Sequence, residues 1–219
     1  MDAIQDHGVI GNCRAAALVS KRGTIDWLCW PRFDSPSIFG ALLDDRAGHW
    51  SLRPTAPFSS SQRYVEGTNV LQTRFETSEG VAVLTDLMPV ASEEEKSRLL
   101  LAEHEILRVL RCEHGAVEVE TVLRPRPGFG RNAPRLEDGG RLGVRIHTSQ
   151  GLMILRGDLP LSIAADGEVR GWKTLRAGEE LHVSLVFARD DPAVLTPLGA
   201  FSHEVVRRSE RWWKSWLSK

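Results

Sequence analysis

Two glutamates at close spacing are the first candidates for chemistry, because a pair of carboxyl groups can serve as a general acid and a general base. Glu118 and Glu120 lie two residues apart on a predicted strand, so they share one face at a separation of ~6.6 Å. Any charged pair at this spacing on a strand meets that separation, and Val117, Val119 and Thr121 occupy the opposite face. We therefore expect both glutamates to face water and to have no catalytic role.

Two further motifs resemble those of known sites only in their letters. Residues 128–133 read Gly-x-Gly-x-x-Ala, but prolines on both sides prevent the helix that a dinucleotide site needs there. His104 precedes Glu105, yet position 108 is Arg108 and not the second histidine of a zinc-binding helix. The sequence has no Cys-x-x-Cys pair and no Gly-x-Ser-x-Gly motif, and its seven histidines are scattered. We predict neither a metal site nor a cofactor.

The polar residues of most interest lie in the tight Pro-Arg-Phe-Asp-Ser-Pro segment that follows an aromatic strand. Arg32 and Asp34 offer hydrogen bonds to sugar hydroxyl groups, and Trp27 or Trp30 could stack on a pyranose face. The alternative is an internal Arg32–Asp34 bridge that shapes the loop, with both tryptophans in the core. Both interpretations stay open at this point.

The elements that position these residues have the pattern of many short strands between glycine- and proline-rich turns. Residues 14–20 and 24–30 flank Gly23 and indicate a hairpin. Further predicted strands, separated by turns that include 78–80 and 113–115, cover 70–77, 81–88, most of 99–112, 117–123, 141–148, 152–155, 161–164, 168–173 and 181–188. This spacing predicts a mainly β fold, a large antiparallel β-sandwich of the supersandwich kind, with a barrel as the alternative.

Two helices are expected within this β framework. Ser35 and Pro36 are a good N-cap and first helical residue, and predict a short internal helix up to Leu43. The run of glutamates at 93–95 is interpreted as a solvated loop. Residues 200–219 contain neither glycine nor proline and have helical apolar spacing.

The C-terminal helix divides the chain into a β-sandwich over 1–198 and a linker helix over 199–219. Trp212, Trp213 and Trp216 give its last turns a large apolar face, which either folds back on the sandwich or meets a partner. We expect these three residues to form an interface, with self-association of the chain as one outcome.

Composition excludes several classes of protein. The formal net charge is -1, so no global attraction to nucleic acid is expected. No stretch approaches the ~20 apolar residues of a membrane span, and the first residues lack the pattern of a secretory signal. Three cysteines, an odd and sparse set, indicate reduced thiols in a cytoplasmic protein.

A long, ordered string of residues resembles the opening of one known family. The segments 9–20, 23–29 and 31–39 are similar to the N-terminal domain of bacterial trehalase-like and glucoamylase-like proteins of glycoside hydrolase family 15. The segments Thr85–Pro89 and Arg211–Trp216 extend the resemblance over essentially the whole chain. Asn12 departs from it, because the family commonly has aspartate there.

The resemblance implies a non-catalytic β-sandwich that precedes an (α/α)6 barrel carrying two catalytic glutamates in an inverting mechanism. No segment of this chain matches that barrel, so we expect a truncated hydrolase part that supports and edges the active site of a missing domain. The resemblance leaves the substrate open among trehalose, maltooligosaccharides and other α-glucosides. The alternatives are a stand-alone carbohydrate-binding or protein-interaction module, and one half of a split enzyme whose barrel binds in trans.

Overall fold

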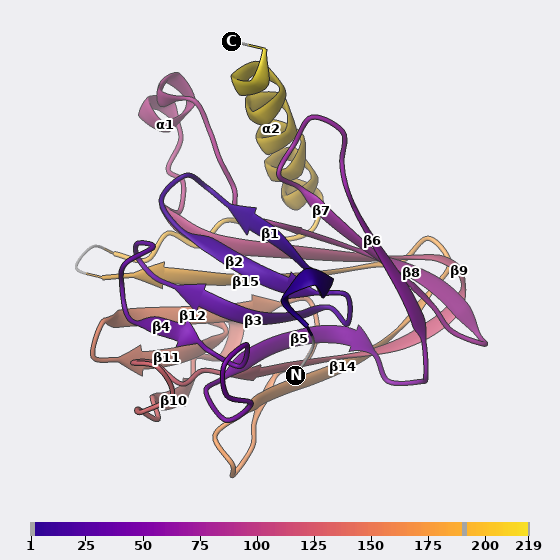
Figure 1. Cartoon of the computed structure of the whole chain (residues 1–219), viewed down its shortest axis with the longest axis horizontal. Helices are drawn as coiled ribbons and strands as arrows, with labels where there is room; N and C mark the ends of the chain where they lie inside the picture. The colour runs from indigo at the N-terminus through magenta and orange to yellow at the C-terminus, as the bar shows by residue number, and fades with distance from the viewer. Residues whose placement is uncertain (1–2, 190–191, 219) are drawn as a thin grey trace.

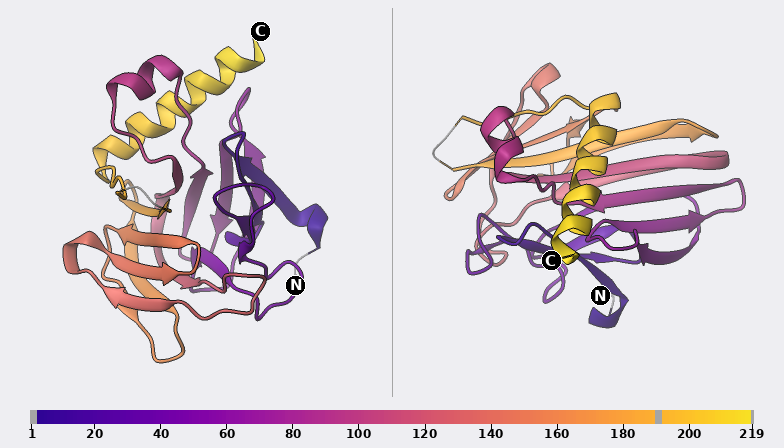
Figure 2. Two further views of the ribbon diagram at one scale, coloured as in Figure 1. Left: turned by 90° about the vertical axis from the view of Figure 1, so that its left-hand side faces the viewer. Right: turned by 90° about the horizontal axis from the view of Figure 1, so that it is seen from above.

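The computed structural model describes residues 3–189 and 192–218, and strands dominate this part of the chain. They form two antiparallel layers, sheet A and sheet B, which face each other across the core (Figures 1 and 2). Sheet A has the order β1-β2-β3-β5-β9-β14-β13, with β4 on β3. Sheet B has the order β6-β7-β8-β9-β15-β12-β11-β10. The predicted antiparallel β-sandwich is therefore confirmed.

The strands have the following bounds. Sheet A contains β1 (His7–Gly11), β2 (Ala16–Ser20), β3 (Thr24–Cys29), β4 (Ser37–Phe39), β5 (His49–Pro54), β13 (Ser162–Ile163) and β14 (Val169–Arg176). Sheet B contains β6 (Ser59–Tyr64), β7 (Leu71–Glu76), β8 (Gly80–Leu87), β10 (Arg135–Asp138), β11 (Val144–Thr148), β12 (Gly151–Gly157) and β15 (Glu180–Ala188). The long strand β9 (His104–Arg124) belongs to both, and two short 3₁₀ turns are η1 (Ile4–Asp6) and η2 (Gly140–Leu142).

The core lies between the sheets because each strand alternates in polarity. In β7, Leu71, Thr73 and Phe75 are buried, whereas the intervening side chains are partly exposed. Apolar side chains from sheet A, such as Ile25, pack in one cluster with those of sheet B, such as Leu185. The predicted hairpin is β2–β3, and Gly23 at its turn has a φ of 73°. A β-carbon there would lie 2.5 Å from the carbonyl oxygen of Leu52, so glycine is required.

Strand β9 replaces the turn that was predicted at 113–115. Its first half pairs with β8 and β15, and its second half pairs with β5 and β14. Val81 is opposite His114 and Ala82 is opposite Cys112, so Glu113 is the extra residue of a β-bulge. Gly115 follows with a φ of 67°. The Glu-His-Gly signal thus marks the point where one continuous strand passes from sheet B to sheet A.

The predicted helix over 36–43 is wrong. Ser37–Phe39 form the edge strand β4, in which Phe39 pairs with Leu28 of β3 and is fully buried. The N–H of Gly40 donates to the carbonyl oxygens of Ala47 and Gly48, which stops any helix. Pairing across the sheet overrides the local cap signal.

The short internal helix is α1 (Glu93–Arg98), in the stretch that was interpreted as a loop. Ser92 caps it: its hydroxyl accepts from the N–H of Glu95, whose carboxylate accepts from the N–H of Ser92. Three glutamates in the first turn and Lys96 and Arg98 in the last complement the helix dipole.

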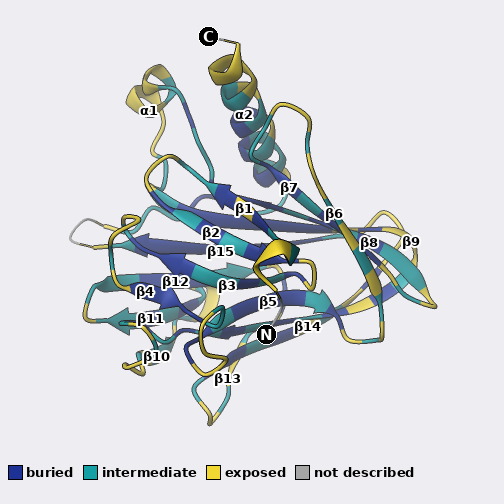
Figure 3. Ribbon diagram, in the orientation of Figure 1, coloured by how far each residue is buried: buried dark blue, intermediate teal, exposed yellow. Residues whose placement is uncertain are grey.

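The predicted C-terminal helix is α2 (Ala200–Leu217), and it lies on the same side of the sandwich as α1 (Figure 2). Its first half packs Val205 onto an apolar cluster, with partly buried Phe201 and Val206 beside it. Leu107 and Val109 of β9 form the base of that cluster. The burial colours show how the helix changes from covered to exposed toward its end (Figure 3). In the described part of the chain, no helix is long and apolar enough to cross a membrane.

Candidate functional site

The loop between β3 and β4 presents the polar pair singled out in the sequence. Arg32 and Asp34 are exposed and bonded to each other, with 3.1 Å between the guanidinium Nε and the carboxylate Oδ1. The hydroxyl of Ser35 accepts from the N–H of Arg32, and the N–H of Phe33 donates to the carbonyl oxygen of Arg14. The expected Arg32–Asp34 bridge exists, but it faces solvent and leaves the outer donors and acceptors accessible.

The two tryptophans of the preceding strand have different environments. Trp30 is fully buried and packs against His104 and Phe187, so it is a core residue and cannot stack on a sugar in this structure. Trp27 is partly exposed on β3, opposite Leu18. The loop carries another aromatic side chain that sequence reasoning passed over, namely Phe33, which is 60% exposed.

The last two turns of α2 leave the sandwich and carry three touching indole rings. Trp212 and Trp216 stack with ring centroids 6.5 Å apart, and Trp213 meets both rings edge-on. Trp212 and Trp213 are half-buried, whereas Trp216 is 51% and Leu217 is 60% exposed. An apolar cluster of this size outside the core is typical of an interaction surface.

A cavity of about 560 Å³ lies between α2, the segment 89–103 that carries α1, and the turn at 12–14. Trp212 and Arg208 line it from the helix, and Arg14 lines it from the turn, where it forms an ion pair with Glu103. The backbone carbonyl oxygen of Arg14 accepts a hydrogen bond from the N–H of Phe33, so the 31–37 loop is attached to the rim of this cavity. A backbone hydrogen bond thus links the loop to the turn that lines this cavity, and Trp212 is the helix candidate that lines it.

The turn at this rim explains the departure at Asn12. The side-chain oxygen of Asn12 accepts from the N–H groups of Arg14 and Ala15, at 3.1 and 3.0 Å. An amide oxygen performs this as well as a carboxylate does, so the turn does not depend on charge.

Glu105 lines the same cavity and is nearly fully buried. Ser184 donates to one of its carboxyl oxygens at 2.6 Å, and the Thr196 hydroxyl lies 3.0 and 3.1 Å from the two oxygens. Burial raises the pKa of Glu105, against the effect of these hydroxyls and of the Arg156 charge. A glutamate near the start of an apolar strand was the signal in the sequence for this buried carboxyl group.

The described residues do not assemble an acid–base pair from the exposed glutamates. Glu118 accepts from the Thr55 hydroxyl at 2.7 Å, and Glu120 accepts from the indole N–H of Trp172 at 3.2 Å. Both are engaged with neighbours on the outer face of sheet A. The Gly128–Ala133 segment is a loop, as expected.

Comparison with known proteins identifies the family. A family model described as "Trehalase-like, N-terminal" matches residues 1–190. A protein named trehalase from Mycolicibacterium smegmatis is 31% identical over 232 aligned residues, which cover 98% of this chain and 34% of the relative. Trehalase 1 of Sulfolobus acidocaldarius is 54% identical over 84 residues, or 38% of this chain and 15% of the relative.

The chain thus spans about a third of the length of the relatives that match it throughout. Its sandwich strands, including the bulged strand β9, lie within the matched residues 1–190, and the helix α2 follows them. This chain belongs to the family of trehalase-like N-terminal domains.

Proposed function

We propose that this chain is the non-catalytic β-sandwich part of a trehalase-like α-glucoside hydrolase, and that it supports and edges the active site of a catalytic domain. The observation that carries the proposal is the match to trehalases along 98% of this chain but only 34% of the relative. The exposed glutamates, each engaged with a neighbouring side chain, agree with a supporting role. We propose the same supporting role for a hydrolase that acts on glucoamylase-type substrates such as maltose.

We propose that the chain consists of a sandwich in residues 1–198 and a connecting helix in residues 199–219. Val205 anchors the first half of α2 to the sandwich, and the tryptophan cluster stands at its other end. We infer that Trp212, Trp213 and Trp216 receive the (α/α)6 barrel, in cis or from a separate chain. Covering the half-exposed Trp216 would remove about 100 Å² from water, roughly 2–3 kcal/mol at ~25 cal/mol per Å².

The exposed loop is proposed to meet the barrel near its sugar pocket. Arg32 and Asp34 supply donors and acceptors that a sugar hydroxyl could engage, and the partly exposed Trp27 is the remaining candidate for stacking. The attachment of the loop to Arg14, on the rim shared with Trp212, supports a common docking face.

An activity assay tests the non-catalytic role. The purified chain is expected to release no glucose from trehalose or maltose. Glucose release that persists through purification and disappears in Glu118→Gln would refute the proposal. A pull-down on insoluble glucan distinguishes this role from that of a stand-alone carbohydrate-binding module. Retention of the chain that soluble oligosaccharide competes away would indicate such a module.

Sedimentation velocity tests the docking surface. With its barrel-facing tryptophans uncovered, the chain is expected to self-associate with increasing concentration, and Trp213→Lys with Trp216→Lys should reduce this. Trp172→Lys is the matched control, because Trp172 is 47% exposed on β14 and lies outside the cluster. A strict monomer at high concentration, with all three indoles shielded from a collisional quencher, contradicts the surface.

We also propose a reducing, cytoplasmic compartment. Cys13, Cys29 and Cys112 are free thiols, and only Cys13 is exposed. Cys13 lies in the turn at 12–14, whereas Cys29 and Cys112 are buried. Without denaturant one thiol should react rapidly with a thiol reagent, and a disulfide in protein from its native cell would contradict the assignment.

A further inference from the structure

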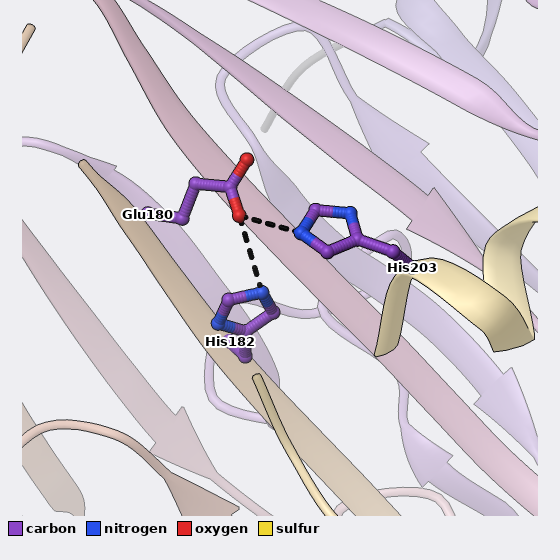
Figure 4. Close-up of side chains that lie close together, drawn as sticks. All are labelled: Glu180, His182 and His203. Carbon is purple, nitrogen blue, oxygen red and sulfur yellow. Dashed lines mark hydrogen bonds and ion pairs between the residues drawn. The ribbon is translucent and has the colours of Figure 1, made fainter. Parts of the chain in front are cut away.

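Three side chains of types that can bind a metal meet where α2 joins the sandwich, although the sequence places the first and the last of them 23 residues apart (Figure 4). Glu180 and His182 lie two residues apart on β15, so they share a face of the strand. His203 reaches them from the first turn of α2. One ligand atom from each lies within 4.8 Å of the other two.

The Glu180 carboxylate stands between the two imidazoles. Its Oε2 lies 2.8 Å from Nε2 of His203 and 3.5 Å from Nε2 of His182. Its other oxygen, Oε1, lies 3.9 Å from Nε of Arg111, which pairs with the carboxylate on that side. Figure 4 shows both imidazole nitrogens directed at the same carboxylate oxygen.

His182 is oriented by a second carboxylate. Its Nδ1 lies 2.9 Å from Oδ2 of Asp158, whose other oxygen accepts the backbone N–H of His182 at 2.9 Å. Lys173 lies 3.8 Å from the same Asp158 oxygen and balances its charge. A carboxylate that holds Nδ1–H leaves the lone pair of Nε2 for a metal, as in the carboxylate–histidine–metal arrangement of many zinc sites.

The Nε2 atom of His182 has no hydrogen-bond partner, and its side chain is only 6% exposed. An unpartnered buried nitrogen costs about 1–3 kcal/mol, so a group that accepts its lone pair would stabilise the site. A direct hydrogen bond to Glu180 would require a proton on this nitrogen and a shorter distance than 3.5 Å. A cation between the two atoms satisfies both of them.

We propose that Glu180, His182 and His203 form a site for a divalent transition metal of the zinc class. Two imidazole nitrogens and one carboxylate oxygen are a donor set that zinc uses, whereas magnesium and calcium prefer oxygen ligands only. Bonds of about 2.0–2.1 Å in a tetrahedral site hold ligand atoms ~3.3 Å apart, so small side-chain rotations complete the geometry. His203 is 41% exposed, which leaves the fourth position open to solvent.

The site lies at the anchored end of α2, and its metal would cross-link that helix to β15. This inference does not depend on the proposed function, because it concerns only how two described elements are joined. Its effect would be to fix the direction of the helix that carries the tryptophan cluster at its other end.

Thermal unfolding of the tag-free, EDTA-treated chain tests the site. Zinc at about 100 times its dissociation constant is expected to raise the Tm by about 5–10 °C, and magnesium or calcium should have little effect. His203→Gln should abolish the rise, and it is a safe variant because this side chain lies at the surface of α2. His147→Gln is the matched control, since His147 is also bonded to a carboxylate, Glu137 at 3.0 Å, but lies outside the three-residue cluster and should leave the rise intact.

Cobalt(II) gives a second readout that does not depend on stability. A protein site with two imidazoles and a carboxylate is expected to give visible absorption bands that grow to one equivalent. These bands should be lost in His203→Gln and in Glu180→Gln, and kept in His147→Gln. Equal zinc responses in wild type and His203→Gln, or no response in wild type, would overturn the proposal in favour of a plain His–Glu–His hydrogen-bonded cluster.

Discussion

The buried ion pair between Arg108 of β9 and Asp86 of β8 links the two sheets, and we expect its loss to destabilise the whole sandwich. Both side chains have no exposed surface. The Arg108 guanidinium donates to both Asp86 oxygens at 2.8 and 3.2 Å, to the carbonyl oxygen of Trp50 at 3.0 Å and to that of Gly23 at 2.8 Å. Arg108 and Asp86 belong to sheet B, whereas the two carbonyl groups come from β5 of sheet A and from the turn between its strands β2 and β3.

The cost of Arg108→Met follows from what is left behind. Burial raises the pKa of Asp86 and the Arg108 charge opposes this, so removing Arg108 strands a carboxyl group in the core. The Gly23 carbonyl keeps a partner, because it also accepts from the N–H of Leu52. Breaking a buried pair by removing one member costs about 3–5 kcal/mol. For a chain of this size that lowers the Tm by about 6–20 °C.

Urea unfolding followed by tryptophan fluorescence measures the effect, because Trp50 lies 4.9 Å below the Arg108 guanidinium. Asp86→Asn should cost a similar amount, and the double variant should lose at least about 2 kcal/mol less than the sum, since neither charge is then stranded. Arg32→Ala is the matched control: its pair with Asp34 is exposed, so the cost should stay below about 1 kcal/mol. An unfolding free energy of Arg108→Met within about 1 kcal/mol of wild type, or strict additivity in the cycle, refutes this reasoning.

Three further outcomes are expected. Burial raises the pKa of Glu105, so the folded state favours its neutral form and loses stability as pH rises from the ordinary glutamate pKa through the raised one; Glu105→Gln should flatten this fall in Tm, and an unchanged slope would contradict the reasoning. Ser92→Ala removes the cap on α1, worth about 1 kcal/mol, and should speed tryptic cleavage within that helix several-fold; equal cleavage rates would mean that the cap is unimportant. Gly23→Ala should cost at least about 2 kcal/mol in urea unfolding, because of its positive φ and the nearby Leu52 carbonyl, and more than Gly178→Ala, where φ is also positive but space is open.

Local sequence patterns predicted those strands, turns and helices that depend on neighbouring residues alone. Alternation placed β7 and β8, the glycine turn placed the β2–β3 hairpin, and helical spacing placed α2. The cap signal at Ser35 failed because Phe39 is held by pairing with β3, a contact that local sequence does not encode. The capping box of Ser92 and Glu95 was a local signal and could have placed α1.

The candidate site depended more on long-range contacts. Nothing local distinguishes the buried Trp30 from the partly exposed Trp27, because both lie at the end of one aromatic run. The predicted absence of a metal site rested on spacing along the chain. Glu180, His182 and His203 meet only because α2 folds back beside β15, so their grouping was invisible before the fold was known.

The shared strand β9 makes the sandwich a single cooperative unit of unfolding. Its backbone is paired with β8 and β15 of sheet B along the first half and with β5 and β14 of sheet A along the second, so one continuous strand joins the two sheets. Hydrogen exchange along β9 should therefore proceed only through global unfolding, at one common free energy on both sides of the bulge. A fragment that contains either sheet alone would carry half a strand with no partner, and it should not hold its shape.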